Sequence, residues 1–292
     1  MKRALITGHR GFCGRHFWRF LLDRGWDGAG VDLAAPFPSD ARQFFLTSKT
    51  RFDLVVHCAA VVGGRAVIDG SPLAQAPNLA LDSMLFEWAQ RTRPGRIIYL
   101  SSSAVYPVRY QFGVPHRLRE DDVELWGRGN EPDQLYGFAK LAGEILAERA
   151  REDGLPVTVV RPFSGSGTDQ SWDYPFPAMI DRARRREEPF VVWGDGNQVR
   201  DFIHIDDVVA AAFELCSASV DGPVNLGTGR PTSMFSLAEM ISERAGYSPL
   251  ITPLTDKPSG VAYRVADVTR MNEFYPARIS LEEGINMALQ ER

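Results

Sequence analysis

Two patterns of hydrophobic and polar positions alternate along the first half of the chain. Short apolar runs end near residues 6, 31, 60, 101 and 161, and apolar residues recur at helical spacing over residues 15–24, 77–91 and 133–152. An unbroken apolar run is typical of a strand that is buried on both faces. Alternation of such strands with helices predicts an α/β fold with a doubly wound parallel sheet and right-handed crossovers.

A glycine-rich turn follows the first predicted strand. It contains Gly8, Gly11 and Gly14 at three-residue spacing and continues into a helix. Gly8 allows a tight turn, Gly11 lets the backbone approach a pyrophosphate, and Gly14 lets the helix pack close to the strand. The amides at the helix N-terminus then face the phosphates. The turn therefore predicts a Rossmann-type dinucleotide site, formed by its glycines together with Arg10, Phe12 and Cys13.

Two charged residues give opposite indications about which dinucleotide binds. Asp32 ends the second predicted strand, where its carboxylate can accept hydrogen bonds from an adenosine ribose and repels a 2′-phosphate. Arg10 in the glycine turn could instead pair with that phosphate. We give Asp32 more weight, because it should face the ribose directly, and expect NAD, with NADP as the alternative.

The pattern changes after residue 163. Shorter strands are predicted over residues 190–193, 201–205 and 224–226, and helices over residues 178–186, 206–217, 236–245 and 281–291. We expect a dinucleotide-binding domain of residues 1–163 plus about 200–226. A smaller, interleaved C-terminal substrate-binding domain then comprises residues of about 164–199 plus 227–292.

Composition and charge exclude several classes of protein. The 292 residues are 44% hydrophobic and 24% charged, as in an ordinary globular protein, and the net charge of −4 offers no electrostatic case for binding nucleic acid or an acidic membrane. The three cysteines share no metal-ligand spacing. We expect reduced thiols, no metal site, no signal peptide, no membrane span and a cytoplasmic location.

Tyr136 and Lys140 lie four residues apart on one predicted helix, so their side chains emerge on the same face. A neighbouring ammonium stabilises a phenolate and makes tyrosine a usable base near neutral pH. A hydroxyl of Ser102 or Ser103, at the end of an adjacent strand, could bond the same substrate oxygen. The arrangement predicts an alcohol/ketone redox centre, with hydride passing to the nicotinamide and the proton to Tyr136.

Together these motifs closely resemble an extended short-chain dehydrogenase/reductase of the nucleotide-sugar epimerase/dehydratase family. The matching motifs are TGHRGFCG at residues 7–14, Asp32, HCAA at 57–60, Asn78, SSSAVYP at 101–107, YGFAK at 136–140, RPF at 161–163, WGDGNQVRDFIHIDDV at 193–208 and NLGTG at 225–229. The resemblance assigns the catalytic hydroxyl to Ser102, beside Tyr136 and Lys140. It adds Ala59, Asn78, Arg161 and Phe163 to the cofactor site, and Ser103, Arg200 and Arg264 to the substrate site.

Departures from the family's sub-patterns narrow the expected reaction. The 4,6-dehydratases carry Asp-Glu where this chain has Ser103 and Ala104, so elimination of water lacks its acid and base. The glycine turn, residues 62–64 and the SSxxYP pattern resemble GDP-fucose synthase, but that family's cysteine is Ala104 here, and its histidine falls near Thr168 and Asp169. Epimerisation at two carbon acids is therefore not expected.

The reaction that remains requires only Ser102, Tyr136, Lys140 and the cofactor. We expect a nucleotide-sugar epimerase acting at carbon 4 through a transient 4-keto intermediate, with tightly bound NAD. The alternatives are an NAD(P)H-dependent 4-keto reductase and a non-catalytic dinucleotide-binding sensor. The resemblance also implies a homodimer through the helices at residues 77–91 and 133–152. Substrate contacts are expected from residues 61–65, 108–113 and 164–177.

Overall fold

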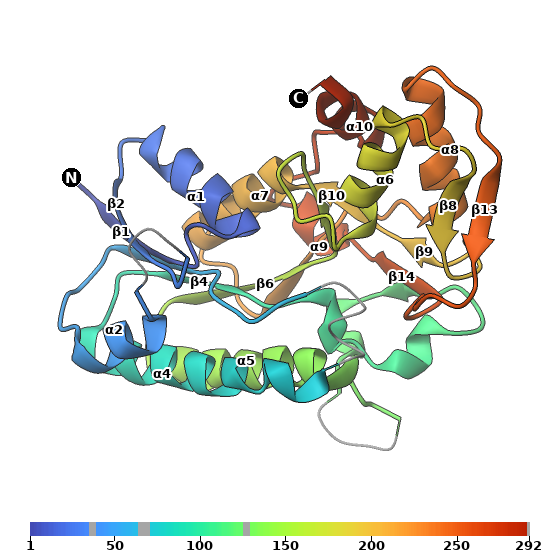
Figure 1. Cartoon of the computed structure of the whole chain (residues 1–292). Coiled ribbons are helices and arrows are strands. Elements are labelled where there is room, and N and C mark those ends of the chain that lie inside the picture. Colours follow the sequence, from blue (N-terminus) through green and yellow to red (C-terminus); the bar gives the residue numbers. More distant parts are fainter. Residues whose placement is uncertain (35–38, 64–70, 125–128, 291–292) are drawn as a thin grey trace.

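Parallel strands form the large sheet at the centre of the protein (Figure 1). The computed structural model describes residues 1–34, 39–63, 71–124 and 129–290. Within them, six strands follow the order β11-β6-β4-β3-β1-β2, all paired in parallel. They are β1 (Arg3–Thr7), β2 (Asp27–Val31), β3 (Leu54–His57), β4 (Ile97–Leu100), β6 (Val157–Pro162) and β11 (Pro223–Leu226). The predicted α/β class and doubly wound sheet are confirmed.

Helices cover both faces of this sheet. On one face lie α2 (Ala41–Thr47), α4 (Pro77–Thr92) and α5 (Gln134–Glu152), and on the other lie α1 (Phe12–Leu22) and α7 (Ile205–Ser217) (Figure 1). Alternate residues of each strand enter the two cores: Ile6 and Val56 pack towards α1 and α7, whereas Leu5 and Val55 pack towards α2 and α4. Since both faces are covered, the inner strands β3 and β4 are buried throughout and have no polar alternation, whereas only Val31 of the edge strand β2 is buried.

A smaller assembly lies beyond the carboxyl ends of these strands. Its core packs three helices, α6 (Pro175–Arg184), α8 (Met234–Arg244) and α10 (Leu281–Gln290), against β8 (Phe190–Trp193). The strand β13 (Ile251–Leu254) pairs in parallel with β8. The predicted helix over residues 281–291 ends at Gln290, and residue 291 lies outside the described part of the chain.

Short strands connect the smaller assembly to the large sheet. In the described residues, β12 (Thr232–Ser233), β9 (Val199–Arg200), β14 (Tyr263–Ala266) and β5 (Arg117–Leu118) form one sheet, and β10 (Phe202–His204) pairs with β7 (Ser164–Ser166). The last short helix is α9 (Thr269–Asn272), which contacts β11. These pairings bring residues about 150 positions apart beside the ends of the central strands, where the candidate site lies.

Candidate active site

A deep cavity runs along the carboxyl ends of the central strands. Its volume is about 1090 Å³, and it extends from the glycine turn after β1, past the start of α5, to β9 and β14. Cavities that hold one small ligand measure roughly 300–1,000 Å³. The volume of this cavity lies just above that range, and its lining reaches from the glycine turn to β9 and β14.

The glycine turn has the backbone geometry that its residues predict. Gly8 adopts a positive φ of 68°, and a Cβ there would lie 2.8 Å from the backbone nitrogen of Ala59. A Cβ at Gly14 would lie only 2.0 Å from the carbonyl oxygen of Gly8. The turn therefore requires glycine at both positions. The first turn of α1, with Phe12 and Cys13, lines the cavity, and its N-cap Gly11 makes no side-chain capping bond, so this helix N-terminus suits a pyrophosphate.

Asp32 lies at the end of β2, on the wall of the same cavity. Its two carboxylate oxygens accept the backbone N–H groups of Arg10 (2.8 Å) and Ala34 (2.8 Å). The Arg10 guanidinium also lies here and donates to the carbonyl oxygen of Ala34. Both residues that bear on the choice between NAD and NADP therefore occupy one end of the cavity.

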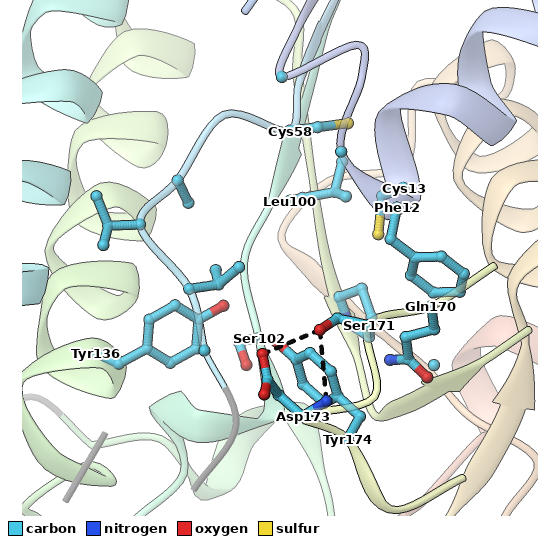
Figure 2. Close-up of a pocket in the computed structure, with 18 of the residues that line it drawn as sticks. Phe12, Cys13, Cys58, Leu100, Ser102, Tyr136, Gln170, Ser171, Asp173 and Tyr174 are labelled. Carbon is cyan, nitrogen blue, oxygen red and sulfur yellow. Dashed lines mark hydrogen bonds between the residues drawn. The ribbon is translucent and has the colours of Figure 1, made fainter. Parts of the chain in front are cut away.

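Ser102 and Tyr136 are brought together by close packing of two segments. Ser102 precedes a short 3-10 helix (Ser103–Val105) and accepts the N–H of Ala104 at 3.1 Å. A Cβ at Gly137 would lie 2.2 Å from the Ala104 carbonyl oxygen, so the start of α5 rests directly on that turn. Figure 2 shows the Ser102 and Tyr136 side chains within the same part of the pocket.

The environment of Tyr136 disfavours its phenolate in the protein alone. Burial raises the pKa of Tyr136 to about 12, and the neighbouring Ser102 hydroxyl works in the opposite direction. Lys140, one helical turn further along α5, is 3% exposed and also lines the cavity. The phenol therefore needs the positive charges of Lys140 and of an oxidised nicotinamide to act as a base near neutral pH.

Three further predicted cofactor residues line the cavity. Ala59 follows β3, Asn78 is the second residue of α4, and Phe163 follows β6. The Asn78 side chain is fully buried and makes two hydrogen bonds to the backbone of Val61, at 2.7 and 2.9 Å. Asn78 therefore holds the loop after β3 in place beside the cavity.

Arg161 does not reach the cavity that the sequence predicted it would line. Its guanidinium forms a bidentate pair with Glu144 of α5, at 2.9 and 2.7 Å, and donates to Tyr106 Oη (3.1 Å) and the Glu120 carbonyl oxygen (2.9 Å). The side chain is 3% exposed. The prediction of a cofactor contact is corrected on this geometry, because these partners direct the guanidinium into the protein interior.

The predicted substrate residues all line the cavity, with Ser103 beside Ser102 and with Arg200 and Arg264 on β9 and β14. Arg200 of β9 donates to the carbonyl oxygens of Val199 (2.8 Å) and Ser259 (3.0 Å). Arg264 of β14 pairs with Asp133 at 2.7 Å and donates to Gln111 Oε1 at 2.5 Å. Two guanidinium groups thus lie on adjacent strands, at a site suited to phosphate oxygens.

The loop that precedes α6 contributes side chains to the cavity that the sequence did not predict individually, but only as part of the segment 164–177. Asp173 and Tyr174 line the cavity, and Ser171 donates to the Asp173 carboxylate at 3.0 Å (Figure 2). Asp169 anchors the loop to α1 through Arg15 (3.0 Å) and His16 (3.0 Å). No motif marks these residues; the predicted segment 164–177 was the only signal. Of the predicted segment 61–65, residues 64 and 65 lie outside the described residues.

Comparison with known proteins gives consistent matches. The family model described as "NAD dependent epimerase/dehydratase family" matches residues 4–227. The dTDP-4-dehydro-6-deoxy-D-allose reductase of Streptomyces bikiniensis is 30% identical, over 97% of this chain and 94% of that protein. Thermotoga maritima UDP-glucose 4-epimerase, solved with UDP-glucose, has a TM-score of 0.85 at 26% identity, covering 99% of this chain and 97% of that one. MoeE5, solved with UDP-glucose and NAD, has a TM-score of 0.84 at 29% identity, covering 99% and 97%.

The chain therefore belongs to the NAD-dependent epimerase/dehydratase family, and it is an enzyme with a Rossmann-type fold. The resemblance predicted from the sequence motifs and the NAD cofactor are both confirmed. The glycine turn, with no room for a Cβ at Gly8 or Gly14, and the carboxylate of Asp32 fit that cofactor. Among the described residues, no helix has the length and apolar character that crossing a membrane would require.

Proposed function

We propose that the enzyme epimerises a nucleotide-diphosphate sugar at carbon 4 through a transient 4-keto intermediate, with NAD kept tightly bound. The observation that carries the proposal is the continuity of the cavity. Ser102, Tyr136 and Lys140 line the same cavity as the glycine turn and the arginine pair, and Arg264 pairs with Asp133 just before the helix that carries Tyr136. A single cavity with all three groups supports a sugar placed between a nicotinamide and a diphosphate.

Each of the three side chains has a distinct part in the proposed reaction. Tyr136 takes the proton from the carbon-4 hydroxyl and later returns it, while Ser102 donates a hydrogen bond to the same oxygen. Lys140 favours the phenolate by its charge and holds the hydroxyls of the nicotinamide ribose. NAD, when bound, supplies the acceptor for the hydride from carbon 4. Rotation of the ketone between the two hydride transfers inverts that carbon.

Arg200 and Arg264 are proposed to bind the diphosphate of the substrate. A guanidinium presents its N–H groups in a planar fork that matches phosphate oxygens. Arg264 also pairs with Asp133, the residue just before α5. A diphosphate bound at Arg264 would therefore lie near the start of the helix that carries Tyr136.

The two aromatic residues near this site differ in burial. Phe202 is buried in the core of the smaller assembly, whereas Trp193 is 38% exposed and is available to the nucleotide.

A 4-keto reductase is the second candidate, and one finding favours it. The Streptomyces bikiniensis relative, similar over almost the whole chain, is by name a reductase of a dTDP-4-dehydro sugar. A reductase would use the same three residues for half of the epimerase cycle, with a reduced cofactor consumed at each turnover.

A proton NMR time course of the purified enzyme tests the two candidates. The enzyme is mixed with UDP-, GDP-, dTDP- and CDP-hexoses and a trace of NAD⁺, without reductant. We expect one sugar to yield its 4-epimer with no net NADH. A parallel incubation supplies 4-keto sugars with NADPH or NADH. If no sugar isomerises while a 4-keto sugar consumes the reduced cofactor, the reductase replaces the epimerase.

The cofactor preference gives a separate prediction. The variant Asp32→Asn keeps an acceptor for one of the two backbone N–H groups and loses the charge that opposes a 2′-phosphate, while Arg10 remains. We expect the ratio of the NAD⁺ and NADP⁺ dissociation constants to shift towards NADP⁺ by at least about tenfold, or roughly 1.4 kcal/mol.

Titration calorimetry with both cofactors measures that ratio. Asp27→Asn, at the opposite and exposed end of β2, is the control and should leave it unchanged. An unchanged ratio in Asp32→Asn would show that the carboxylate does not face the ribose.

We also propose the domain division expected from the sequence, residues 1–163 plus about 200–226 and about 164–199 plus 227–292. Its support is that β11 completes the large sheet beside β6, while α6, α8 and α10 share a separate core. The assignment of residues 108–132 needs refinement, because β5 within this segment pairs with β14, which belongs to the second proposed domain.

A homodimer in the cytoplasm completes the proposal. The helices α4 and α5 lie side by side on one face of the sheet (Figure 1). Phe138 of α5 is 52% exposed. Phe86 and Trp88, by contrast, are buried within the protomer core and are not available to a partner. The three cysteines are free thiols, which suits a reducing compartment. Light scattering at several concentrations tests the dimer, whose mass should be twice that of the chain.

A further inference from the structure

A cluster of buried polar side chains lies beneath α5, on the sheet side of Lys140. Asp82 of α4 is 1% exposed, and its carboxylate accepts two hydrogen bonds. Tyr99 of β4 donates its hydroxyl to Asp82 Oδ2 at 2.6 Å, and His57 of β3 contacts Asp82 Oδ1 through Nε2 at 3.1 Å. We call Asp82, Tyr99 and His57 the Asp82 cluster. The proposed reaction gives none of these three residues a role.

The hydrogen bonds define the charge state of the cluster. Burial lowers the pKa of His57, so the ring is neutral and carries one proton. The pKa of Asp82 is held below its usual value, so the carboxylate can only accept and Nε2 must donate to it, which leaves Nδ1 to accept from Thr7 Oγ at 2.9 Å. The ring proton therefore resides on Nε2 and points at Asp82. Within the cluster, the Asp82 carboxylate then holds a full negative charge.

Lys140 lies directly against this cluster. Its ammonium nitrogen is 5.1 Å from the centre of the Tyr99 ring, the same ring whose hydroxyl donates to Asp82. An ammonium that is almost fully buried needs a compensating negative charge nearby. Burial alone would raise the pKa of Asp82, yet the charge of Lys140, followed by the hydrogen bonds from His57 and Tyr99, holds that pKa below its usual value. The two charges therefore stabilise each other.

Gly143 shows how closely α5 rests on the cluster. It follows Lys140 by three residues, and a Cβ built on it would lie 1.8 Å from Tyr99 Oη and 2.8 Å from Asp82 Oδ2. Glycine in the middle of a helix is unfavourable. Here it creates the space that the hydroxyl and the carboxylate occupy, so the position of α5 and that of the cluster depend on each other.

We propose that Asp82, held by Tyr99 and His57, is a positioning residue: it is the buried counter-charge that fixes the Lys140 ammonium beside Tyr136 and sets the pH at which this pair releases its first proton. The inference rests on the proposed roles of Tyr136 and Lys140. It adds a carboxylate that touches neither substrate nor cofactor but acts through the lysine.

The direction of the effect follows from electrostatics. A negative charge near Tyr136 and Lys140 opposes the loss of a proton from either group, so removing that charge must make the first proton leave at lower pH. The other titratable groups that face this pair from the elements around it are Cys13 of α1, His57 of β3, Cys58 after β3, Tyr99 of β4, Glu144 of α5, and Tyr174 before α6. The negative charge of Glu144 is already compensated by its ion pair with Arg161.

The test compares the wild type with Asp82→Asn, both saturated with NAD⁺. Tyrosine labelled with ¹³C at Cζ and lysine labelled at Cε report by NMR the first proton loss of the pair, with Tyr136→Phe used to assign the signal. We expect that proton loss to move down by on the order of one pH unit, the size of effect that one charge has over several ångströms in a protein interior. The acid limb of the pH profile of kcat should move by the same amount.

Asp207→Asn is the matched control. Asp207 of α7 is also buried and also accepts from a tyrosine, Tyr275 Oη at 2.9 Å, but it lies on the opposite face of the sheet. A merely structural role for Asp82 would lower stability in both variants and leave the titration in place. No shift, or a shift to higher pH, in Asp82→Asn overturns the proposal. The NMR titration needs no substrate. Its result therefore tests the role of Asp82 even if no substrate of the enzyme is found.

A second variant keeps the proposal testable if Asp82→Asn does not fold. In the wild type the depressed pKa of Asp82 contributes stability at neutral pH that is lost on acidification. Lys140→Met removes the counter-charge, so burial then raises the pKa of Asp82. The ionised carboxylate therefore destabilises the variant at neutral pH instead of stabilising it. The melting temperature of Lys140→Met should fall well below that of the wild type at pH 8, and the gap should narrow at pH 5. An equal gap at both pH values contradicts the pairing.

Discussion

Replacement of Tyr136 by phenylalanine is expected to lower kcat for sugar conversion by about 10²–10⁴-fold, the usual contribution of a general acid–base group. The change removes only the hydroxyl that exchanges a proton with the substrate. The glycine turn, Asp32 and Lys140 are unchanged, so the dissociation constant of NAD⁺ should stay within about threefold of the wild type. Steady-state rates and calorimetric titration with NAD⁺ measure the two quantities.

Tyr247→Phe is the control for this substitution, because Tyr247 follows α8 in the smaller assembly and does not line the cavity. It should keep wild-type kcat. Unchanged turnover in Tyr136→Phe would remove Tyr136 from the mechanism. Loss of both turnover and NAD⁺ binding would show that the hydroxyl acts in assembling the site and not in proton transfer.

Replacement of Arg161 by methionine is expected to destabilise the protein by about 3–5 kcal/mol, the typical result of removing one partner from a buried ion pair. Glu144 would be left buried with an uncompensated charge, and the hydroxyl of Tyr106 would lose a donor. Urea unfolding followed by circular dichroism measures the change in the free energy of unfolding.

Arg149→Met, which breaks an exposed pair with Glu152 on the same helix, should leave that free energy unchanged within error. The affinity for NAD⁺, measured where Arg161→Met is fully folded, should also be retained. A folded Arg161→Met protein of wild-type stability that no longer binds NAD⁺ would restore Arg161 to the cofactor site.

The inner strands of the large sheet could be predicted from the sequence because they are buried on both faces. Such strands are unbroken apolar runs, and β3, β4 and β6 end within three residues of the predicted ends of those runs at residues 60, 101 and 161. The helix α2 was missed because it has only seven residues, of which Ala41 and Phe45 are buried. The two-residue strands β5, β9 and β12 have no pattern of their own and form only through partners far away in the chain.

The site was predicted where a motif ties residue type to backbone position. The glycines of the turn, together with Ser102, Tyr136 and Lys140, are such cases, and all line one cavity. Arg161 belongs to a motif as well, but successive side chains of a strand face opposite sides. Its partner Glu144 lies on a helix seventeen residues earlier, which no local pattern reveals. Asp82 escaped notice for the same reason, since its role depends on contacts with β3, β4 and α5.

Epimerisation in D₂O tests the central claim most directly. The enzyme, loaded with NAD⁺, is incubated in D₂O with the nucleotide sugar that it converts, and the product is analysed by proton and deuterium NMR. An internal hydride cycle driven by proton transfer at Tyr136 predicts that the 4-epimer forms with its original hydrogen at carbon 4, with no solvent deuterium at carbons 3 or 5 and no net NADH. Deuterium at carbon 3 or 5, or conversion only with stoichiometric reduced cofactor, would contradict the account.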